Sequence, residues 1–307
     1  MAAEARCRNS TFAFMHQQKA GGMSVRAIMG AIVASHPRRL RLQESPARFG
    51  ECPCTEPAER KRTWFFSDQG PFCPECPDLQ WATIFREPLP RLRSAFYFCQ
   101  TAEGRADHET CSTGYPDEAG SICAFGRAWG SLAFSKFAHA EAPELEAIVA
   151  RCPERAAGRA AAGGRGRRPR APSETFRWAY RLQRCGLNGL RTAEGRRLFA
   201  LVNASLRALN VGLLERWPAA MAKFAAQSGC AGWAAAPHQR VYHASLLRSS
   251  AAGASALVRR AERELAGCRR ELLEEHLAAD VLLYAEAERV FDEQWAALGE
   301  AAKRGSK

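Results

Sequence analysis

Short apolar runs along the chain alternate with longer segments in which apolar residues recur every three or four positions. The short runs predict β-strands at residues 11–15, 63–67, 81–86 and 210–215. The longer segments predict helices near residues 23–35, 89–99, 141–151, 174–185, 196–209 and 217–227. Because strands that alternate with helices usually form parallel sheets, this order predicts an α/β fold.

The last part of the chain has a different pattern. Residues 256–299 are amphipathic over a long stretch, which predicts one long helix or a helix pair. The apolar residues close to helical spacing are Leu272, Leu273, Leu277, Val281, Tyr284 and Phe291. We expect this C-terminal extension to be a packing helix.

Two stretches interrupt the alternation of strands and helices. Residues 100–124 are polar and contain cysteines, so they predict a loop insertion in which Cys111 and Cys123 close a small loop. Residues 153–174 are rich in glycine, alanine and arginine, which predicts a disordered linker. The chain, residues 1–307, is expected to be a single domain that contains both stretches.

The charge of the chain indicates an anionic partner. The formal net charge is +12 at pH 7 and the sequence pI is about 9.4, which suits a nucleotide, a sulfated glycan, a nucleic acid or a membrane surface. Charge alone does not choose among these partners. No window of the sequence is apolar over the roughly 18 to 20 residues that a membrane span needs, so no span is expected in this chain.

The twelve cysteines favour an oxidising compartment, because so many thiols are usually paired there. Four of them allow a second interpretation. Cys52, Cys54, Cys73 and Cys76 lie at the short spacings with which four thiolates bind structural zinc, although Cys-x-Cys suits zinc less well than Cys-x-x-Cys. The sequence leaves zinc, disulfides and free thiols open at these positions.

The segment Phe14–Ser24, with the sequence FMHQQKAGGMS, joins a predicted strand to a predicted helix. Such a turn directs backbone N–H groups and the positive end of the helix dipole toward an anion. Gly21 and Gly22 would let the backbone approach the anion, and Lys19 would add a full positive charge. The lysine precedes the glycines, unlike in the Walker pattern, which weakens an ATPase or kinase interpretation. The alternative is an ordinary strand-to-helix turn with a solvated lysine.

A second segment, TIFREPLPRLRSAFYF at residues 83–98, places Arg86 at the end of a predicted strand. From there a guanidinium can bind a phosphate with two hydrogen bonds, and Ser94 can bind the same group from the following helix. The alternative is an amphipathic helix with solvated arginines.

Together, the two segments resemble motifs of the carbohydrate sulfotransferases, whose donor is 3′-phosphoadenosine-5′-phosphosulfate. The first is similar to the family's 5′-phosphosulfate loop, H-x-P-K-x-G-G-T-S, at His16, Lys19, Gly21, Gly22 and Ser24. The second is similar to its 3′-phosphate motif, R-[DE]-P-x-x-R-x-x-S-x-[YF], at Arg86, Glu87, Pro88, Arg91, Ser94 and Phe96. The chain has Gln18 where proline is usual and Met23 where threonine is usual, so one hydroxyl beside the phosphosulfate is lost.

The resemblance extends along most of the chain outside residues 100–174. Residues 210–224 and 276–294 are similar to segments of the 2-O-sulfotransferase-like branch. It implies a P-loop-like three-layer α/β sandwich with a central, mainly parallel sheet. It also implies a Golgi lumen location, with an anchor or signal outside this chain. The implied partner is a glycan, above all a polysaccharide, rather than a nucleic acid, and small alcohols are the alternative acceptors.

The activity that the resemblance implies is transfer of a sulfuryl group from this donor to a glycan hydroxyl, without a metal. The donor would bind to Arg86, Ser94 and the loop residues Lys19, Ala20, Gly21, Gly22, Met23 and Ser24. Lys19 would also be catalytic, by stabilising charge on the leaving phosphate.

The base that accepts the hydroxyl proton is expected to be Asp68, just after the strand at 63–67. His36 and His16 are the alternatives for this base. The rival function is a non-catalytic protein that binds polyanions, either glycan or nucleic acid, through the arginines of residues 153–174.

Overall fold

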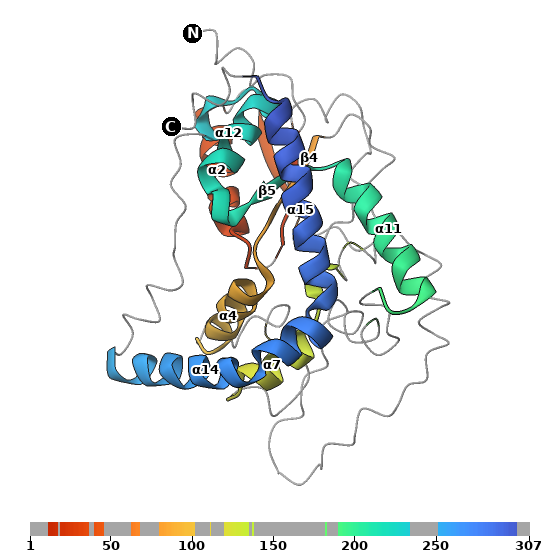
Figure 1. Cartoon of the computed structure of the whole chain (residues 1–307). Helices are drawn as coiled ribbons and strands as arrows, with labels where there is room; N and C mark the ends of the chain where they lie inside the picture. The colour runs from red at the N-terminus through yellow and green to blue at the C-terminus, as the bar shows by residue number, and fades with distance from the viewer. Residues whose placement is uncertain are drawn as a thin grey trace. The chain divides into compact units, whose positions relative to one another are not determined.

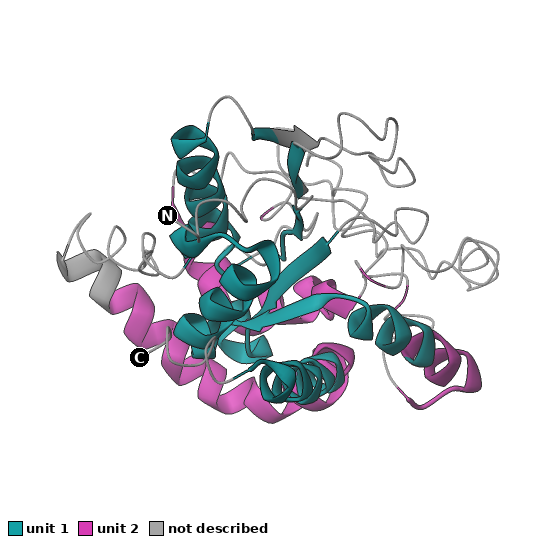
Figure 2. Ribbon diagram, turned by 90° about the horizontal axis from the view of Figure 1, so that it is seen from above, with its two compact units in different colours: residues 1–91, 200–241, 281–307 teal, residues 92–199, 242–280 magenta. Residues whose placement is uncertain are grey.

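The computed structural model describes residues 12–17, 19–36, 40–45, 63–67, 80–101, 111, 120–134, 137, 182, 190–233 and 251–299. The chain divides into two compact units, coloured separately in Figure 2. Unit 1 comprises residues 1–91, 200–241 and 281–307, and unit 2 comprises residues 92–199 and 242–280.

Among the described residues, unit 1 contains a sheet of five strands, all parallel. The strands are β1 (Phe12–Met15), β2 (Arg41–Ser45), β3 (Thr63–Ser67), β4 (Gln80–Phe85) and β5 (Asn210–Leu213). Their order in the sheet is β2-β3-β1-β4-β5. The predicted α/β fold with a central parallel sheet is confirmed. The sequence patterns missed β2, whose residues RLQES alternate too weakly to stand out from a loop.

The register aligns the carboxyl ends of the three central strands. Met15 of β1 lies opposite Ser67 of β3 on one side and opposite Thr83 of β4 on the other. The chain leaves β1 toward β2 on one side of the sheet, whereas it later runs from β4 to β5 on the other side. In open parallel sheets, ligands bind beyond the carboxyl ends of the strands where the direction of winding reverses. The segment after β1 lies at such a point.

Helices of unit 1 follow the strands along the chain. α2 (Gly22–Ser35) follows β1, and the 3₁₀ turn η2 (Leu214–Arg216) leads from β5 into α12 (Trp217–Ser228). A second 3₁₀ turn, η3 (Ala231–Trp233), packs against both α2 and α12. Figure 1 labels α2 and α12, together with α15 (Ala278–Ala297), nearly all of which belongs to unit 1.

An aromatic cluster fixes α12 and η3 to the sheet. The ring centroids of Phe12 and Trp233 are 5.0 Å apart, those of Phe224 and Trp233 are 5.5 Å apart, and Trp64 stacks on Trp233. All four side chains are fully buried. Burying one large apolar side chain stabilises a fold by roughly 1.5 to 3 kcal/mol. The cluster therefore holds α12 and η3 against the sheet at the amino-terminal ends of β1 and β3.

The described part of unit 2 is largely helical. Its elements include α7 (Ile122–Trp129), α14 (Ala251–Glu271) and the π-helical turn η4 (Leu272–His276). α4 (Pro88–Cys99) begins in unit 1 and ends in unit 2, and α11 (Ala193–Arg207) also crosses between units. The helix pair predicted at 256–299 is confirmed as α14 and α15, with η4 between them. α7 begins inside the loop insertion predicted at 100–124, so that boundary was wrong.

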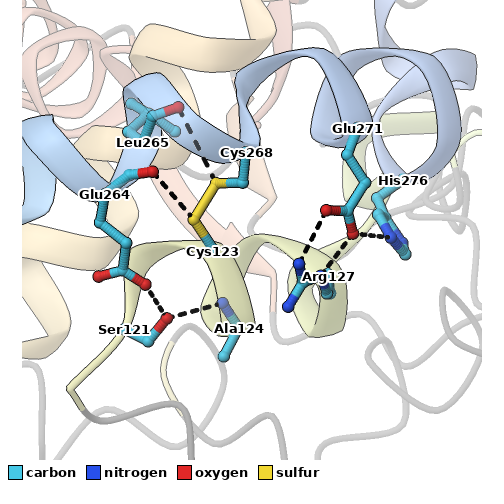
Figure 3. Close-up of a disulfide and its surroundings, with 9 residues drawn as sticks. All are labelled: Ser121, Cys123, Ala124, Arg127, Glu264, Leu265, Cys268, Glu271 and His276. Carbon is cyan, nitrogen blue, oxygen red and sulfur yellow. Dashed lines mark hydrogen bonds and ion pairs between the residues drawn. A yellow bond between two sulfur atoms is a disulfide. The ribbon is translucent and has the colours of Figure 1, made fainter.

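Two disulfides correct the predicted cysteine pairing. Cys111 pairs with Cys99, and Cys123 pairs with Cys268, so the loop expected between Cys111 and Cys123 does not form. Cys123 is on the buried face of α7, which packs along α14, and the two cysteines meet between these helices (Figure 3). The pairing depends on a contact across 145 residues, which local spacing does not reveal.

Polar contacts between α7 and α14 flank this disulfide. The guanidinium of Arg127 donates two hydrogen bonds to the carboxylate of Glu271, at 2.6 and 2.8 Å, and Ser121 donates to Glu264 (Figure 3). The hydrogen bond from Arg127 lowers the pKa of Glu271 to about 2. The disulfide and these contacts join two segments of unit 2 that are far apart in sequence.

Several sequence predictions lie outside the described residues. These are the helix at 141–151, nearly all of the helix at 174–185, the linker at 153–174, Asp68, and the four cysteines at 52, 54, 73 and 76. Within the described part of the chain, no helix is long and apolar enough to cross a membrane.

Candidate anion-binding site

The turn between β1 and α2 has a left-handed backbone at two positions. Lys19 has a φ of 62° and Gly21 a φ of 88°. The N–H of Ala20 donates to the carbonyl of Gln17 at 3.1 Å, which closes the turn. Left-handed backbone costs a residue with a side chain about 1 to 2 kcal/mol, so Lys19 is held there by its surroundings. Glycine at position 21 avoids that cost.

Gly21 is also the N-cap of α2. The N–H groups of Ser24 and Val25 donate to the carbonyl of Gly21, at 3.0 and 3.2 Å. Helix geometry leaves the N–H groups of Gly22 and Met23 without an acceptor one turn earlier in the helix. The first turn of α2 contains no acidic residue that would compete for them. This helix end therefore suits an anion through its N–H groups and its dipole.

Gly22 is required by the imidazole of His16. A Cβ atom at Gly22 would lie 1.7 Å from Cδ2 of His16, far closer than two carbon atoms can approach. The imidazole is held in place by the ring of Phe66 on β3, whose centroid is 5.5 Å away. The contact supports a role for His16 in orienting the loop, which is one of the alternatives that its sequence position left open.

Arg86, the first residue after β4, joins the second predicted motif to the first. Its Nη1 donates to the backbone carbonyl of Lys19 at 3.2 Å. Below this contact, the hydroxyl of Thr83 donates to the carbonyl of Met15 at 2.9 Å. The pairing of β1 with β4 thus brings two segments that are 67 residues apart to one edge of the sheet. The structure places Lys19 and Arg86 together there, and both are half-buried.

Three helices of the site begin at this edge. α2, α4 and α12 follow the carboxyl ends of β1, β4 and β5, so their positive dipole ends lie on the same side of the sheet. Two of the strand ends also carry Lys19 and Arg86. The combined field of these helices and cations favours a ligand with more than one negative charge.

Glu215 is a residue of this edge to which the sequence analysis gave no role. Its Oε1 accepts a hydrogen bond from the backbone N–H of Glu87 at 3.1 Å, and its Oε2 accepts one from the hydroxyl of Tyr284 at 3.0 Å. Burial, together with the charge of Glu215, raises the pKa of Tyr284, so the hydroxyl stays a donor. The signal in the sequence was an acidic residue at the very end of the strand predicted at 210–215.

The remaining predicted site residues have different positions. Ala20, Gly22 and Ser24 are buried in the loop and the first helical turn, whereas Met23 is 45% exposed, so its backbone rather than its side chain faces the turn. Ser94 is half-buried on the second turn of α4 and belongs to unit 2.

Two of the three candidates for the base, His16 and His36, are described by the structure. His36 follows α2, a helix of 14 residues or about 21 Å, so it lies at the opposite end of the helix from the loop. There its Nδ1 lies 2.9 Å from the carbonyl of Ile32 and 2.9 Å from the hydroxyl of Ser35. β3, which leads to Asp68 in the sequence, ends at Ser67 beside Met15, although Asp68 itself is outside the described residues.

The described residues contain no group of three or more His, Cys, Asp or Glu side chains placed to hold an ion. No family model, curated protein or solved structure was found to match the chain. The geometry of the loop and of its neighbouring strand ends is therefore the basis for a functional proposal.

Proposed function

We propose that the chain is a sulfotransferase that moves a sulfuryl group from 3′-phosphoadenosine-5′-phosphosulfate to a hydroxyl of a glycan, with a polysaccharide as the acceptor class. The observation that carries the proposal is the hydrogen bond from Arg86 to the carbonyl of Lys19. It joins two cationic residues, each at the end of a strand, beside the N-termini of α2 and α4. A donor with phosphate groups at both ends of a ribose needs such a pair.

In the proposed reaction, the loop from Lys19 to Ser24 holds the phosphosulfate and Arg86 holds the 3′-phosphate. The acceptor oxygen forms a bond to sulfur while the bond from sulfur to the phosphate oxygen breaks. Negative charge grows on that phosphate, where the ammonium of Lys19 and the N–H groups of Gly22 and Met23 stabilise it. Asp68 is the proposed acceptor of the hydroxyl proton.

The proposed location is the Golgi lumen. The support is the disulfide bonding of Cys99, Cys111, Cys123 and Cys268, because disulfides persist in oxidising compartments of the secretory pathway. No metal is proposed, since the transfer requires none.

The test of the proposal compares Lys19→Ala and Arg86→Ala in an assay with radiolabelled donor and a panel of desulfated polysaccharides. Arg86→Ala should raise the Michaelis constant for the donor, because it removes a ground-state contact worth about 1.5 to 3 kcal/mol. Lys19→Ala should lower turnover more than it weakens product binding, because its charge acts in the transition state. Lys19→Arg should not restore full activity, since a planar guanidinium does not replace a compact ammonium in this turn.

Wild-type protein that transfers no label to any hydroxyl acceptor would refute the proposed activity. Variants that transfer label as fast as the wild type, at the same donor concentration dependence, would refute the assigned roles.

A further inference from the structure

A continuous set of hydrogen bonds crosses the carboxyl ends of three neighbouring strands of unit 1. It starts at the carbonyl of Lys19 after β1, which accepts from the side chain of Arg86 after β4. The next residue, Glu87, donates its backbone N–H to Glu215 after β5. Tyr284 of α15 then donates to the second oxygen of the same carboxylate. The backbone that carries Arg86 is therefore held by its side chain on one side and by Glu215 on the other.

The hydrogen bond from the N–H of Glu87 to Glu215 lies at the start of α4, where it can fix the backbone beside Arg86. Pro88, the first residue of the helix, has no N–H and fixes its own φ near −65°. The N–H of Glu87 is thus the first donor at this helix end, and Glu215 caps it from η2, the turn that follows β5. A carboxylate is also favoured there by the dipole of α4.

Both partners of the Glu215 carboxylate that the structure describes are neutral donors, a backbone amide and a phenol. Neither is a cation that would make it a surface ion pair. The neighbouring Arg216 instead pairs with Asp292 and lies over the ring of Phe291, 4.4 Å from its centroid. The carboxylate of Glu215 is therefore held between two neutral donors, and one of them, the N–H of Glu87, belongs to the residue that follows Arg86.

We infer that Glu215 and Tyr284 are positioning residues for the 3′-phosphate end of the donor: they fix the backbone of Glu87 and, through it, the guanidinium of Arg86. The ligand in this inference rests on the proposed function, whereas the link from Glu215 to the Arg86 segment does not. In this inference Glu215 acts on the donor only through Arg86, because the hydrogen bond of its carboxylate holds the backbone of Glu87. A second consequence is that α15, from the far end of the chain, controls donor affinity.

The experiment has two arms and uses the full chain with its disulfides intact. In the first arm, hydrogen exchange of the Glu87 amide is measured at residue resolution in the wild type, Glu215→Ala, Glu215→Gln and Tyr284→Phe. We expect faster exchange in Glu215→Ala and little change in Glu215→Gln, because the amide oxygen of glutamine still accepts the hydrogen bond. Glu293→Ala, which removes an exposed carboxylate of α15 that pairs with Arg289, is the matched control and should leave the exchange unchanged.

In the second arm, adenosine 3′,5′-bisphosphate and adenosine 5′-monophosphate are titrated into the same proteins. Glu215→Ala should weaken binding of the bisphosphate about tenfold and leave binding of the monophosphate unchanged, since only the bisphosphate has the 3′ group. In an Arg86→Ala background, Glu215→Ala should have no further effect. If Glu215 had only a structural role, Glu215→Ala would weaken binding of both nucleotides, and its effect would add to that of Arg86→Ala.

The outcomes separate this inference from the proposed function. Wild-type protein that binds no bisphosphate refutes the proposed function, and the exchange arm then decides the link between Glu215 and Glu87 alone. Exchange of the Glu87 amide that is the same in Glu215→Ala and in the wild type overturns the inference. Equal weakening of the two nucleotides by Glu215→Ala also overturns it.

Discussion

Lys223 is a buried cation that gives the fold a specific dependence on pH. Its Nζ donates to the carbonyl of Val211 on β5 and to the side chain of Gln294 on α15, and it lies 4.6 Å from the centroid of the Phe291 ring. Gln294 accepts in turn from the N–H of Val211 at 3.1 Å. The two side chains therefore satisfy backbone groups at the outer edge of β5, the last strand of the described sheet.

Burial of Lys223, whose side chain is only 1% exposed, lowers its pKa from 10.5 to about 7, with the charge of Arg216 as a smaller cause. Below pH 7 the lysine is charged in both the folded and unfolded states, so the full cost of burying the charge is present. Between pH 7 and pH 10.5 the unfolded chain binds the proton and the folded chain releases it, so stability rises with pH. The slope approaches about 1.4 kcal/mol per pH unit, and the whole rise is about 5 kcal/mol.

The perturbation that tests this reasoning is Lys223→Met, which keeps the length of the side chain and removes the titrating group. Urea unfolding of both proteins is followed without reductant from pH 7 to pH 9.5, where the wild type should gain about 3 kcal/mol relative to the variant. The variant leaves the carbonyl of Val211 without this donor, so its absolute stability should also fall, and only the difference in slope is diagnostic. Parallel pH profiles for the two proteins would refute the account of Lys223.

Three other changes have distinct expected results. Gly22→Ala should abolish nucleotide binding because the new Cβ collides with His16. Gly30→Ala on the same helix, where a Cβ meets nothing within 4 Å, should stabilise α2 by about 0.5 to 1 kcal/mol without changing binding, and loss of binding in both variants would contradict the assigned collision. Replacing Cys123 and Cys268 with alanine should lower the free energy of unfolding by about 5 kcal/mol, because this disulfide closes a loop of 145 residues. Removing the Cys99–Cys111 disulfide, which closes 12 residues, should lower it by about 3 kcal/mol, and equal losses in chemical denaturation would contradict the loop-closure reasoning. Transfer activity should survive dialysis against a chelator, and activity that returns only when zinc is added back would contradict the metal-free mechanism.

The strands that the sequence predicted are those with several consecutive large apolar residues. β1, β3 and β4 are buried on both faces. A strand of this kind is a short continuous run of apolar residues, which can be recognised in a single sequence. β2 has a polar sequence that does not by itself indicate a strand. It is a strand because it pairs with β3, and this pairing cannot be read from its own residues. The short helix α7 was missed because Gly126 lies at its centre. The structure explains that glycine, since a Cβ there would lie 2.8 Å from the side chain of Leu272.

The residues of the candidate site likewise include some that local sequence identifies and one that only a long-range contact reveals. Lys19, Gly21 and Gly22 could be selected from the sequence because a strand, a glycine turn and a helix are local features. Arg86 could be selected from its own strand end, and the pairing of β1 with β4 then brought it to the loop. Glu215 could not be selected in this way, because its contact with Glu87 spans 128 residues and depends on the position of β5 in the sheet.

The central claim is that the loop after β1 and the start of the segment after β4 bind the two phosphate groups of one nucleotide. Calorimetric titration of adenosine 3′,5′-bisphosphate into the wild type and Arg86→Ala tests it most directly. The account predicts saturable binding at one site in the wild type, weakened by about 10- to 150-fold in Arg86→Ala through loss of a charge-assisted hydrogen bond. The absence of binding by the wild type, or the same dissociation constant in both proteins, would contradict it.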